Sequence, residues 1–401
     1  MQQSFKTSIT AMACALCAAG LASAAQAQDK MRIGFITDMS SLYADVEGKN
    51  GAVAIQMAID DFGGKVLGKP IELLTADHQN KADIAASKAR EWIDTQGISL
   101  VFGGTNSATA LAMAKVAQEK KRVFIDNGAG SSALTNEQCS PYTVHYAFDT
   151  VALAKGTGAA VVEHGGKSWF FLTADYAFGH ALEADTTKIV ESKGGKVLGA
   201  VRTPLNASDF SSFMLQAQSS KAQILGLANA GGDTINSIKA AREFGVTKKM
   251  KLAGLLVFFS DIHSLGLKNT EGMQFTAPWY WDMNDASRQF ADAFMAKTQR
   301  RPSEIQAADY SATMNYLKAV EKAGTLDADK VMAAWKSTKM DDFFGSGYIR
   351  DDGRYAHDMY LMQVKSPAES KGTWDYYKII KKLPADQVWT TKAESKCQYW
   401  R

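Results

Sequence analysis

The 401-residue sequence has few of the residues on which metal sites and catalytic centres depend. It contains four cysteines and six histidines, and no two histidines have the spacing of metal ligands, so we expect no metal site. It lacks the phosphate-binding Gly-x-x-x-x-Gly-Lys-Ser/Thr loop, the Gly-x-Ser-x-Gly elbow and the His-Glu-x-x-His zinc motif. Because no activated nucleophile is recognisable either, the sequence predicts a protein that is not an enzyme and that needs no cofactor.

An excess of charge of one sign is also missing. The 45 basic and 42 acidic residues give a formal charge of +3, and no basic block stands out, which argues against a nucleic-acid partner. After the N-terminal segment, no apolar run approaches the roughly 18 residues of a membrane span, so we expect a soluble mature protein. The chain is long enough for two or three domains.

The N-terminal segment has the pattern of a cleaved secretory signal. Lys6 precedes a small, apolar stretch from Ile9 to Ala22, and Ala25-Gln26-Ala27 matches the small-x-small cleavage pattern. The apolar run is short for a membrane anchor, and Cys17 follows a leucine rather than the small residue of a lipoprotein signal. Residues 1–27 are therefore predicted to be a signal peptide, and the mature protein is predicted to be periplasmic.

Cleavage would leave two cysteines, Cys139 and Cys397. In an oxidising compartment these two residues could form one disulfide bond, which would connect the C-terminus to a loop in the middle of the chain. The sequence does not show whether they lie close together, so the bond stays an open possibility at this point.

Predicted strands alternate with predicted helices in two blocks that are separated near Asp149. The strands of the first block are Met31–Thr37, Pro70–Thr75, Ile98–Phe102 and Val123–Asp126, and its helices are Gly48–Phe62, Ala82–Trp92 and Ala108–Gln118. The strands of the second are Ser168–Leu172, Lys196–Val201, Ala222–Leu227 and Met250–Ala253, and its helices are Ala177–Ser192, Asp209–Ser219 and Thr234–Phe244. This alternation predicts an α/β fold with two Rossmann-like lobes, each built on a parallel central sheet.

The pattern changes after Pro278. Three helices are predicted there, followed by two short strands: Ala286–Thr298, Gln306–Ala323, Ala328–Lys336, Met359–Val364 and Trp374–Ile380.

Small polar loops follow the predicted strands of the first block, at residues 38–45, 103–107 and 127–132. In open parallel sheets, ligands bind outside the carboxyl ends of the strands. Backbone amides and hydroxyl groups at helix N-termini can bind an anion without arginine, so these loops are candidates for a carboxylate site. The alternative is that they are tight turns and helix caps, which use the same residue types.

Three segments carry a resemblance to a known family: IGFITDMSSLYADVEGKNGAVAIQMAIDDFGG, LVFGGTNSATALAMAKVAQEKKRVFID and TADYAFGHAL. In their order and spacing, the chain resembles the leucine/isoleucine/valine-type solute-binding proteins of bacterial ABC transporters, which have the type I periplasmic binding fold. The resemblance runs from about Met31 to the C-terminus.

The resemblance implies two lobes joined by three hinge crossovers, near Ala147–Thr150, Thr276–Pro278 and Phe344–Gly347. Lobe 1 would comprise residues 28–147 and 278–344, and lobe 2 residues 148–277 and 345–401. A small molecule would bind between the lobes and close them by a hinge motion. The closed protein, a monomer by default, would then dock on the permease subunits of an ABC transporter in the inner membrane.

The family's ligand contacts can be placed on this chain residue by residue. Ser107 matches the hydroxyl group that holds the ligand carboxylate, and Gly128, Ala129 and Gly130 match the loop that completes this grip. Gly130 stands where the family usually has a threonine. Tyr43 matches an aromatic ligand contact, and Phe178 falls where a binding tyrosine often stands, with Tyr176 two residues earlier. The other candidate ligand-contact residues are Ser41, Asn106, Tyr146, Asn229, Trp279 and Trp281, and Phe258 and Phe259 add two more rings that could line the cleft.

One departure from the family bears on the ligand. The second-lobe segment that supplies an acid for the ligand's α-ammonium corresponds here to Ala253–Val257, which has no carboxylate. Burying an unpaired ammonium costs several kcal/mol. The expected ligand is therefore a small organic acid with an aromatic or apolar body.

Other readings stay open. If Asp149, Asp233 or Asp261 replaces the missing acid, a receptor for branched-chain amino acids remains possible, as does one for amides or urea. A sensor partner or a periplasmic enzyme that uses the same fold is the alternative from another class.

Overall fold

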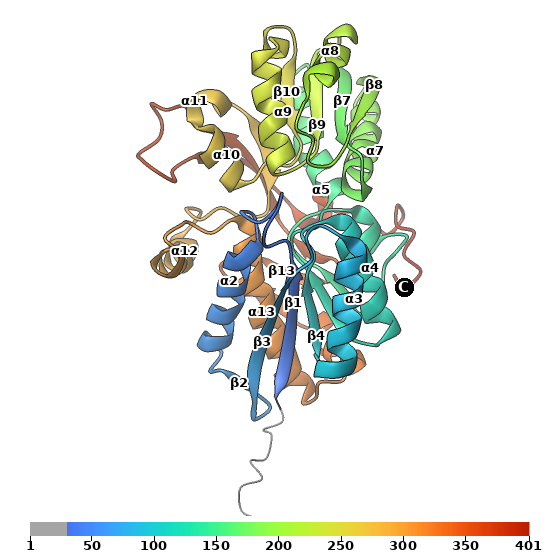
Figure 1. The fold of residues 1–401 in the computed structure, drawn as a ribbon, viewed down its shortest axis with the longest axis vertical. Helices are drawn as coiled ribbons and strands as arrows, with labels where there is room; N and C mark the ends of the chain where they lie inside the picture. The colour runs from blue at the N-terminus through green and yellow to red at the C-terminus, as the bar shows by residue number, and fades with distance from the viewer. Residues whose placement is uncertain (1–29, 401) are drawn as a thin grey trace, which may run out of the picture.

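The computed structural model describes residues 30–400, so the predicted signal peptide and its cleavage site lie outside the described residues. Two α/β lobes lie one above the other along the long axis of the molecule (Figure 1). The predicted α/β fold with parallel sheets is confirmed. Within the described chain, no helix combines the length and the apolar character that crossing a membrane requires.

Lobe 1 is built on a six-stranded sheet. Its strand order is β2 (Lys65–Val66), β3 (Lys69–Asp77), β1 (Met31–Thr37), β4 (Leu100–Gly103), β5 (Val123–Asp126) and β6 (Thr143–His145). All neighbouring strands are parallel except β2 and β3. The short strands β2 and β6 were missed in the sequence, because neither has enough residues to show a pattern.

The two faces of this sheet are covered by different helices. Successive side chains of a strand point to opposite faces, so Val101 packs with α3 (Ala82–Glu91) and α4 (Ser107–Glu119). Its neighbours Leu100 and Phe102 pack on the other face. The helices of that face are α2 (Gly48–Asp61), α13 (Glu304–Ala323) and α14 (Ala328–Lys336). Burial of both faces explains why these strands read as continuous apolar runs in the sequence.

Lobe 2 contains a parallel four-stranded sheet in the order β10 (Lys251–Gly254), β9 (Ile224–Ala228), β7 (Ser168–Ala174) and β8 (Lys196–Thr203). Helices α8 (Ser211–Ser219) and α9 (Gly232–Glu243) pack on one face. The other face is covered by α7 (Ala177–Ser192) and by a helix that runs through α5 (Thr150–Leu153), a π-helical turn at Ala154–Gly158 and α6 (Ala159–Glu163).

Smaller elements complete the fold. Two three-stranded sheets have the orders β11 (Gln274–Ala277), β15 (Met359–Val364), β16 (Tyr377–Leu383) and β12 (Lys339–Asp341), β13 (Ser346–Ile349), β14 (Tyr355–His357). The remaining helices are α10 (Phe259–Leu265), α11 (Leu267–Thr270), α12 (Asp285–Thr298) and α15 (Ala385–Val388). Short 3-10 or π-helical turns occupy Trp92–Gln96, Ser132–Thr135 and Val246–Lys248.

The chain passes between the lobes after β6, after β11 and between β14 and β15. The first two passages coincide with predicted crossovers, but the third prediction, at Phe344–Gly347, is wrong. Strands β13 and β14 stay with lobe 1, where the amide of His145 donates to the carbonyl of Gly353 at 2.9 Å. Residues 345–357 therefore belong to lobe 1, and the chain crosses at Asp358. Gly347 is not a hinge glycine: a Cβ there would lie 2.1 Å from the carbonyl oxygen of Ala356 on the neighbouring strand.

The C-terminal segment after β16 contacts both lobes. A disulfide bond joins Cys397 to Cys139 of lobe 1, with their Cα atoms 5.6 Å apart. On the lobe 2 side, the Lys155 ammonium donates to the carbonyl of Trp389 at 2.8 Å. The assignment of residues 384–401 to lobe 2 alone is therefore wrong for the part that the structure describes, because the disulfide bond holds this segment against lobe 1.

We predict that the double variant Cys139→Ser/Cys397→Ser unfolds at lower urea concentration than the wild type. The disulfide closes a long loop, and its removal is expected to lower the free energy of unfolding by about 2–5 kcal/mol. A reductant should destabilise the wild type by a similar amount and leave the double variant unchanged. An unfolding curve of the wild type that does not respond to reductant would contradict this prediction.

Candidate functional site

A small cavity of about 10 Å³ lies between the two lobes. Lobe 1 contributes Tyr43, Thr105, Gly128 and Gly130, and lobe 2 contributes Tyr176, Phe178, Ala230, Leu256 and Phe258. Every one of these residues follows the carboxyl end of a parallel strand, as the rule for open α/β sheets predicts. The cavity is too small for an organic ligand, so the lobes are closed on each other in this structure.

A pair of tyrosines joins the lobes across the cavity. The hydroxyl oxygens of Tyr43 and Tyr176 are 2.6 Å apart, and the amide of Tyr43 donates to the Asp38 carboxylate at 2.8 Å. Burial raises the pKa of both phenols, so both remain protonated at neutral pH. Each hydroxyl group can therefore donate one hydrogen bond and accept another.

Gly130 makes room for a phenylalanine. A Cβ atom on Gly130 would lie 2.7 Å from the ring of Phe178 and 2.8 Å from the ring of Phe148. The ring of Phe178, in the first turn of α7, therefore occupies the space that a side chain at position 130 would need. The carbonyl of Gly130 accepts a hydrogen bond from the amide of Thr150 at 2.8 Å, which holds the loop beside the first crossover.

The loops of lobe 1 present backbone donors. Within residues 30–400, the amides of Gly128 and Gly130 have no hydrogen-bond acceptor. Ser107 is buried at the first position of α4, and its hydroxyl oxygen accepts from the amide of Ser131 at 3.2 Å. Asn106 caps α4 by accepting from the amide of Ala108 at 2.8 Å. Asn106, Ser107 and Ala129 thus lie next to the lining residues in sequence but support the loops rather than line the cavity.

Two predicted contact residues have structural roles beside the cleft. The Ser41 hydroxyl donates to the carboxylate of Asp38 at 2.8 Å, within the turn that follows β1. Asn229 is fully buried and donates to the Ser237 hydroxyl oxygen at 2.8 Å while accepting from Thr234. Ser41 and Asn229, which we predicted to contact the ligand, do not line the cavity in this structure, where their side chains hold the loops that carry neighbouring residues.

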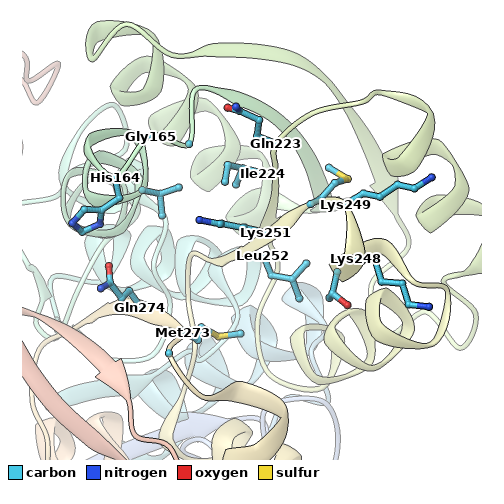
Figure 2. A pocket seen from close by; sticks show the side chains of 15 residues that line it. His164, Gly165, Gln223, Ile224, Lys248, Lys249, Lys251, Leu252, Met273 and Gln274 are labelled. Atoms are coloured by element: carbon cyan, nitrogen blue, oxygen red, sulfur yellow. The ribbon is translucent and has the colours of Figure 1, made fainter.

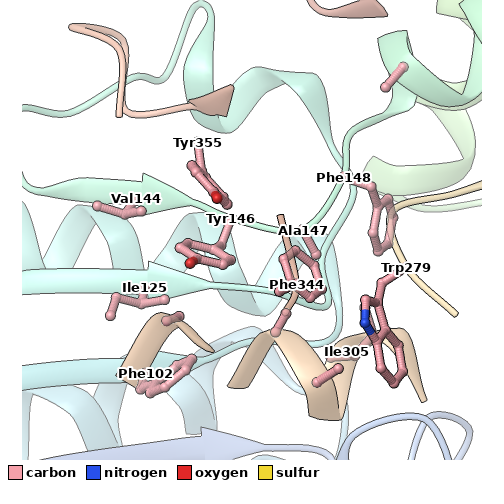
Figure 3. Packing of buried hydrophobic residues seen from close by; sticks show 14 of the residues in the cluster. Phe102, Ile125, Val144, Tyr146, Ala147, Phe148, Trp279, Ile305, Phe344 and Tyr355 are labelled. Atoms are coloured by element: carbon pink, nitrogen blue, oxygen red, sulfur yellow. The ribbon is translucent and has the colours of Figure 1, made fainter. Parts of the chain in front are cut away.

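Tyr146 and Trp279, which we also predicted to contact the ligand, do not line the cavity in this structure. Both belong to the apolar core, as the side chains in Figure 3 show. The Tyr146 ring lies 4.3 Å from that of Tyr355, and the indole of Trp279 packs edge-on against Phe343 and donates to the Ser287 hydroxyl oxygen at 3.0 Å. These rings bury apolar area in lobe 1 and at the second crossover instead of meeting a ligand.

Trp281 lies outside the cavity as well. Its indole donates to the carbonyl of Trp374 at 2.8 Å, and the Arg301 guanidinium lies 4.2 Å from its ring centroid. The residue therefore joins the second crossover to lobe 2. No sequence pattern separates this packing role from ligand stacking, since both use a tryptophan in a loop that follows a strand.

Thr105, Ala230 and Leu256 line the cavity but were not predicted as individual ligand contacts, although Thr105 belongs to the candidate loop at residues 103–107. All three come within two residues of a strand end, which was the only available signal. Phe258, which was considered as a cleft ring, lines the cavity, whereas Phe259 packs with Tyr376 and Tyr377 inside lobe 2.

The three acids considered as ammonium partners do not line the cavity. Asp149 caps α5 by accepting from the amide of Ala152 at 2.8 Å and pairs with the buried guanidinium of Arg354 at 3.2 Å. Asp261 caps α10 by accepting from the amide of Phe258 at 3.0 Å, and burial raises its pKa to about 7.

Of the three acids, Asp233 is the one whose charge acts on the tyrosines that line the cavity. It is fully buried at the start of α9, and one carboxylate oxygen accepts from the amide of Asn206 at 3.1 Å. The other oxygen has no partner within residues 30–400. Burial raises the pKa of Asp233 to about 6, and its charge raises the pKa of both Tyr43 and Tyr176, so it lies near the tyrosine pair.

A larger cavity, of about 600 Å³, lies elsewhere in lobe 2. It is lined by the start of β9, the start of β10 and the start of β11, together with the end of α6 (Figure 2). Although three lysines line it, Lys248 and Lys249 extend away from its centre in Figure 2. Its position at the amino ends of the strands sets it apart from the site between the lobes.

Residues 30–373 match the family model described as "Periplasmic binding protein". The chain is 65% identical to a periplasmic binding protein from Burkholderia mallei, with a TM-score of 0.92 and coverage of 93% of this chain and 100% of that one. It is 38% identical to a branched chain amino acid ABC transporter periplasmic ligand-binding protein from Burkholderia xenovorans LB400, with a TM-score of 0.83 and coverage of 93% and 100%.

An ABC transporter solute binding protein from Rhodopseudomonas palustris BisB5, solved with 3,4-dihydroxy benzoic acid, is 25% identical. Its TM-score is 0.80, and the alignment covers 89% of this chain and 98% of that one.

We predict that Tyr176→Phe shifts the ligand-free protein toward an open arrangement. The variant loses a hydrogen bond between the lobes, which is worth about 0.5–1.5 kcal/mol, so the closed-to-open ratio should fall by roughly two- to tenfold. Single-molecule energy transfer between dyes on α3 and α8 would measure this ratio. Tyr348→Phe, an exposed residue on β13, is the matched control, and equal ratios in both variants would contradict the prediction.

Proposed function

The chain belongs to the periplasmic binding protein family, and from this premise we propose that it captures a small aromatic or apolar carboxylate for an ABC importer. Family members of this kind bind a solute rather than convert it. The ligand would be held between the lobes, at the cavity that the strand ends of both lobes form. Location in the periplasm, a monomeric state and docking of the closed form on permease subunits follow from the same proposal.

The proposal depends most on the absence of charged side chains from the cavity lining. None of the nine lining residues is an acid, a lysine, an arginine or a histidine. The α-ammonium of an amino acid would be buried there without a counter-charge, at a cost of several kcal/mol. A carboxylate is better matched, because the amides of Gly128 and Gly130 and the N-terminus of α4 offer donors and a favourable dipole.

The aromatic residues favour a ligand with a flat or apolar body. Tyr43, Tyr176, Phe178 and Phe258 are four of the nine lining residues, and all but Tyr176 are almost fully buried. Ring pairs contribute about 0.5–1.5 kcal/mol beyond the area they bury. The relative that was solved with 3,4-dihydroxy benzoic acid supports an aromatic acid as the ligand class.

Binding requires the lobes to open and to close again around the ligand. The cavity of about 10 Å³ cannot hold a benzoate-sized molecule, so the tyrosine pair must separate for entry. The three passages between the lobes are the places where the chain can bend: residues 146–149, residues 278–284 and Asp358.

A branched-chain amino acid is the second candidate, and Asp233 is the observation that favours it. Its unpartnered carboxylate oxygen would meet an ammonium group if the tyrosine pair moved aside on opening. The name of the relative from Burkholderia xenovorans agrees with this reading. Against it, Asp233 does not line the cavity in the closed arrangement.

We predict that 3,4-dihydroxybenzoate, 4-hydroxybenzoate or benzoate stabilises the protein without its signal segment, whereas leucine and valine do not. A ligand at 100 times its Kd adds about 2.7 kcal/mol to the free energy of unfolding, which a thermal-shift screen detects. A shift with leucine or valine alone would refute the aromatic-acid proposal.

Replacement of Ser107 by alanine should weaken binding of an aromatic acid by about 1–3 kcal/mol, because the loop that carries Ser131 loses its anchor. Calorimetric titration would measure the effect. Ser219→Ala, on the exposed side of α8, is the matched control. Equal affinities for Ser107→Ala and the wild type would contradict the role of Ser107 as the anchor of this loop in ligand binding.

Asp233→Asn separates the two candidate ligands. The variant removes the charge behind the tyrosine pair but keeps the side-chain shape. Aromatic acids should bind it as tightly as they bind the wild type or more tightly, since a nearby negative charge is gone. If leucine is the ligand, the same variant should lose its binding.

A further inference from the structure

Two buried carboxyl groups, those of Glu47 and Asp309, lie side by side against Gly51, beneath the cavity loops of lobe 1. Glu47 is the residue before α2, Asp309 lies on α13, and both are completely buried. Gly51 leaves room for their contact: a Cβ atom there would lie 2.7 Å from the Asp309 carboxyl and 3.0 Å from the Glu47 side chain.

Each carboxyl group holds one of the loops that line the cavity. Glu47 accepts a hydrogen bond from the hydroxyl of Thr105 at 2.8 Å and another from Thr37, and Thr105 itself lines the cavity. Asp309 accepts from the side-chain amide of Asn127 at 2.7 Å, and Asn127 directly precedes Gly128 of the lining. A continuous chain of contacts therefore joins the loop after β4 to the loop after β5 through the two acids.

The pair needs a proton, because no cation neutralises it. The charged groups that act on it are themselves acids, Asp38 at the end of β1 and Asp126 at the end of β5. The nearby bases face these two acids instead: His78 acts with Asp38, and both His145 and Arg354 act on Asp126. Within residues 30–400, no group of acidic or histidine side chains is arranged to hold a metal ion.

Two oxygen atoms mark the place of this proton. One carboxyl oxygen of Glu47 and one of Asp309 have no donor within residues 30–400, although both atoms are buried. Two bare carboxylates in contact in a dry interior repel each other strongly, and one shared proton removes the repulsion and supplies the missing donor. Burial raises the pKa of Glu47 to about 7 and that of Asp309 further above its ordinary value.

We propose that Glu47 and Asp309 share one buried proton and act as positioning residues that hold the two cavity loops in the geometry for ligand capture. The role of the loops in capture rests on the proposed function, whereas the shared proton and the order of the loops do not. Release of this proton places two negative charges in contact behind Thr105 and Asn127 and loosens both loops. Ligand affinity therefore falls as the pH rises through the range in which the pair titrates.

The sign of the stability effect follows from the raised pKa. An acid that binds its proton more tightly in the folded state contributes most at low pH. The free energy of unfolding is then lost as the pH rises from 4.5, the ordinary glutamate value, through about 7. Asp309→Asn and Glu47→Gln each provide a permanent donor in place of the proton, so both variants should lose this dependence.

The first test needs no ligand. Carbon-13 NMR of the side-chain carboxyl groups counts the protonated groups near neutral pH. Asp309→Asn should have one protonated carboxyl group fewer than the wild type. If Asp309 were simply ionised, its loss would leave that number unchanged. The amides of Ala108, Ala129 and Ser131, which form hydrogen bonds in the two loops, should exchange as slowly in Asp309→Asn as in the wild type. In Asp309→Ala, which has no donor for Glu47, they should exchange about tenfold faster.

Asp60→Asn is the matched control, since it removes one exposed acid from α2 without touching the loops. Equal exchange rates in Asp309→Ala and the wild type would overturn the positioning role. An ionised pair at neutral pH in the NMR spectrum would overturn the shared proton. If Asp309→Ala does not fold, Glu47→Gln and Asp309→Asn still decide the matter through the pH dependence of their unfolding.

The second test uses benzoate, whose own charge stays constant from pH 6 upward. Wild-type affinity should fall by up to tenfold for each pH unit above the pKa of the pair, and Asp309→Asn should bind with an affinity that is independent of pH. An equal pH dependence in the two proteins would overturn the link to capture. Failure of benzoate to bind at any pH counts against the proposed function, and the ligand-free test then decides the role of the pair.

Discussion

The carboxyl ends of the parallel strands in both lobes face one another, and every residue that lines the cavity follows one of those strand ends. Parallel strands place their loops at one edge of a sheet, so two such sheets that meet edge to edge bring six loops together. Tyr43 and Tyr176 meet across this interface at 2.6 Å, because β1 and β7 end on opposite sides of it. The hinge passages, the cavity and its lining are all consequences of this arrangement.

None of the residues that line the cavity is charged, yet acids surround it. Asp233 lies behind the tyrosine pair, and Glu47, Asp126 and Asp309 lie beneath the loops of lobe 1. Burial raises the pKa of each of these carboxyl groups. Taking a carboxylate out of water is unfavourable, so a protonated group is the lower-energy form where no cation is near. The residues that line the cavity thus offer uncharged hydrogen-bond donors to an anion. Beneath them, Glu47 and Asp309 hold the loops by accepting hydrogen bonds from Thr105 and Asn127.

Apolar periodicity and strand–helix alternation were enough to predict both lobes and most of their elements. Short strands such as β6 were missed, since three residues carry no period. The third crossover was misplaced because glycines near Gly347 resemble a hinge, whereas the structure uses that glycine for close approach of two strands. A local sequence pattern shows which backbone conformations and contacts a residue allows. Packing against residues far away in the chain selects one of them.

By itself, the sequence determined the α/β class, the two lobes and the loops that meet at the cleft, and the family resemblance added several lining residues, among them Tyr43, Gly130 and Phe178. Backbone hydrogen bonding and burial of alternate side chains are local enough to be read from residue order. Only the tertiary structure decided that Tyr146 and Trp279 belong to the core, that Cys139 meets Cys397, and that Glu47 and Asp309 lie together against Gly51. Most of these contacts join residues that are distant in the sequence, and their partners are chosen by the docking of whole elements, which no local pattern encodes.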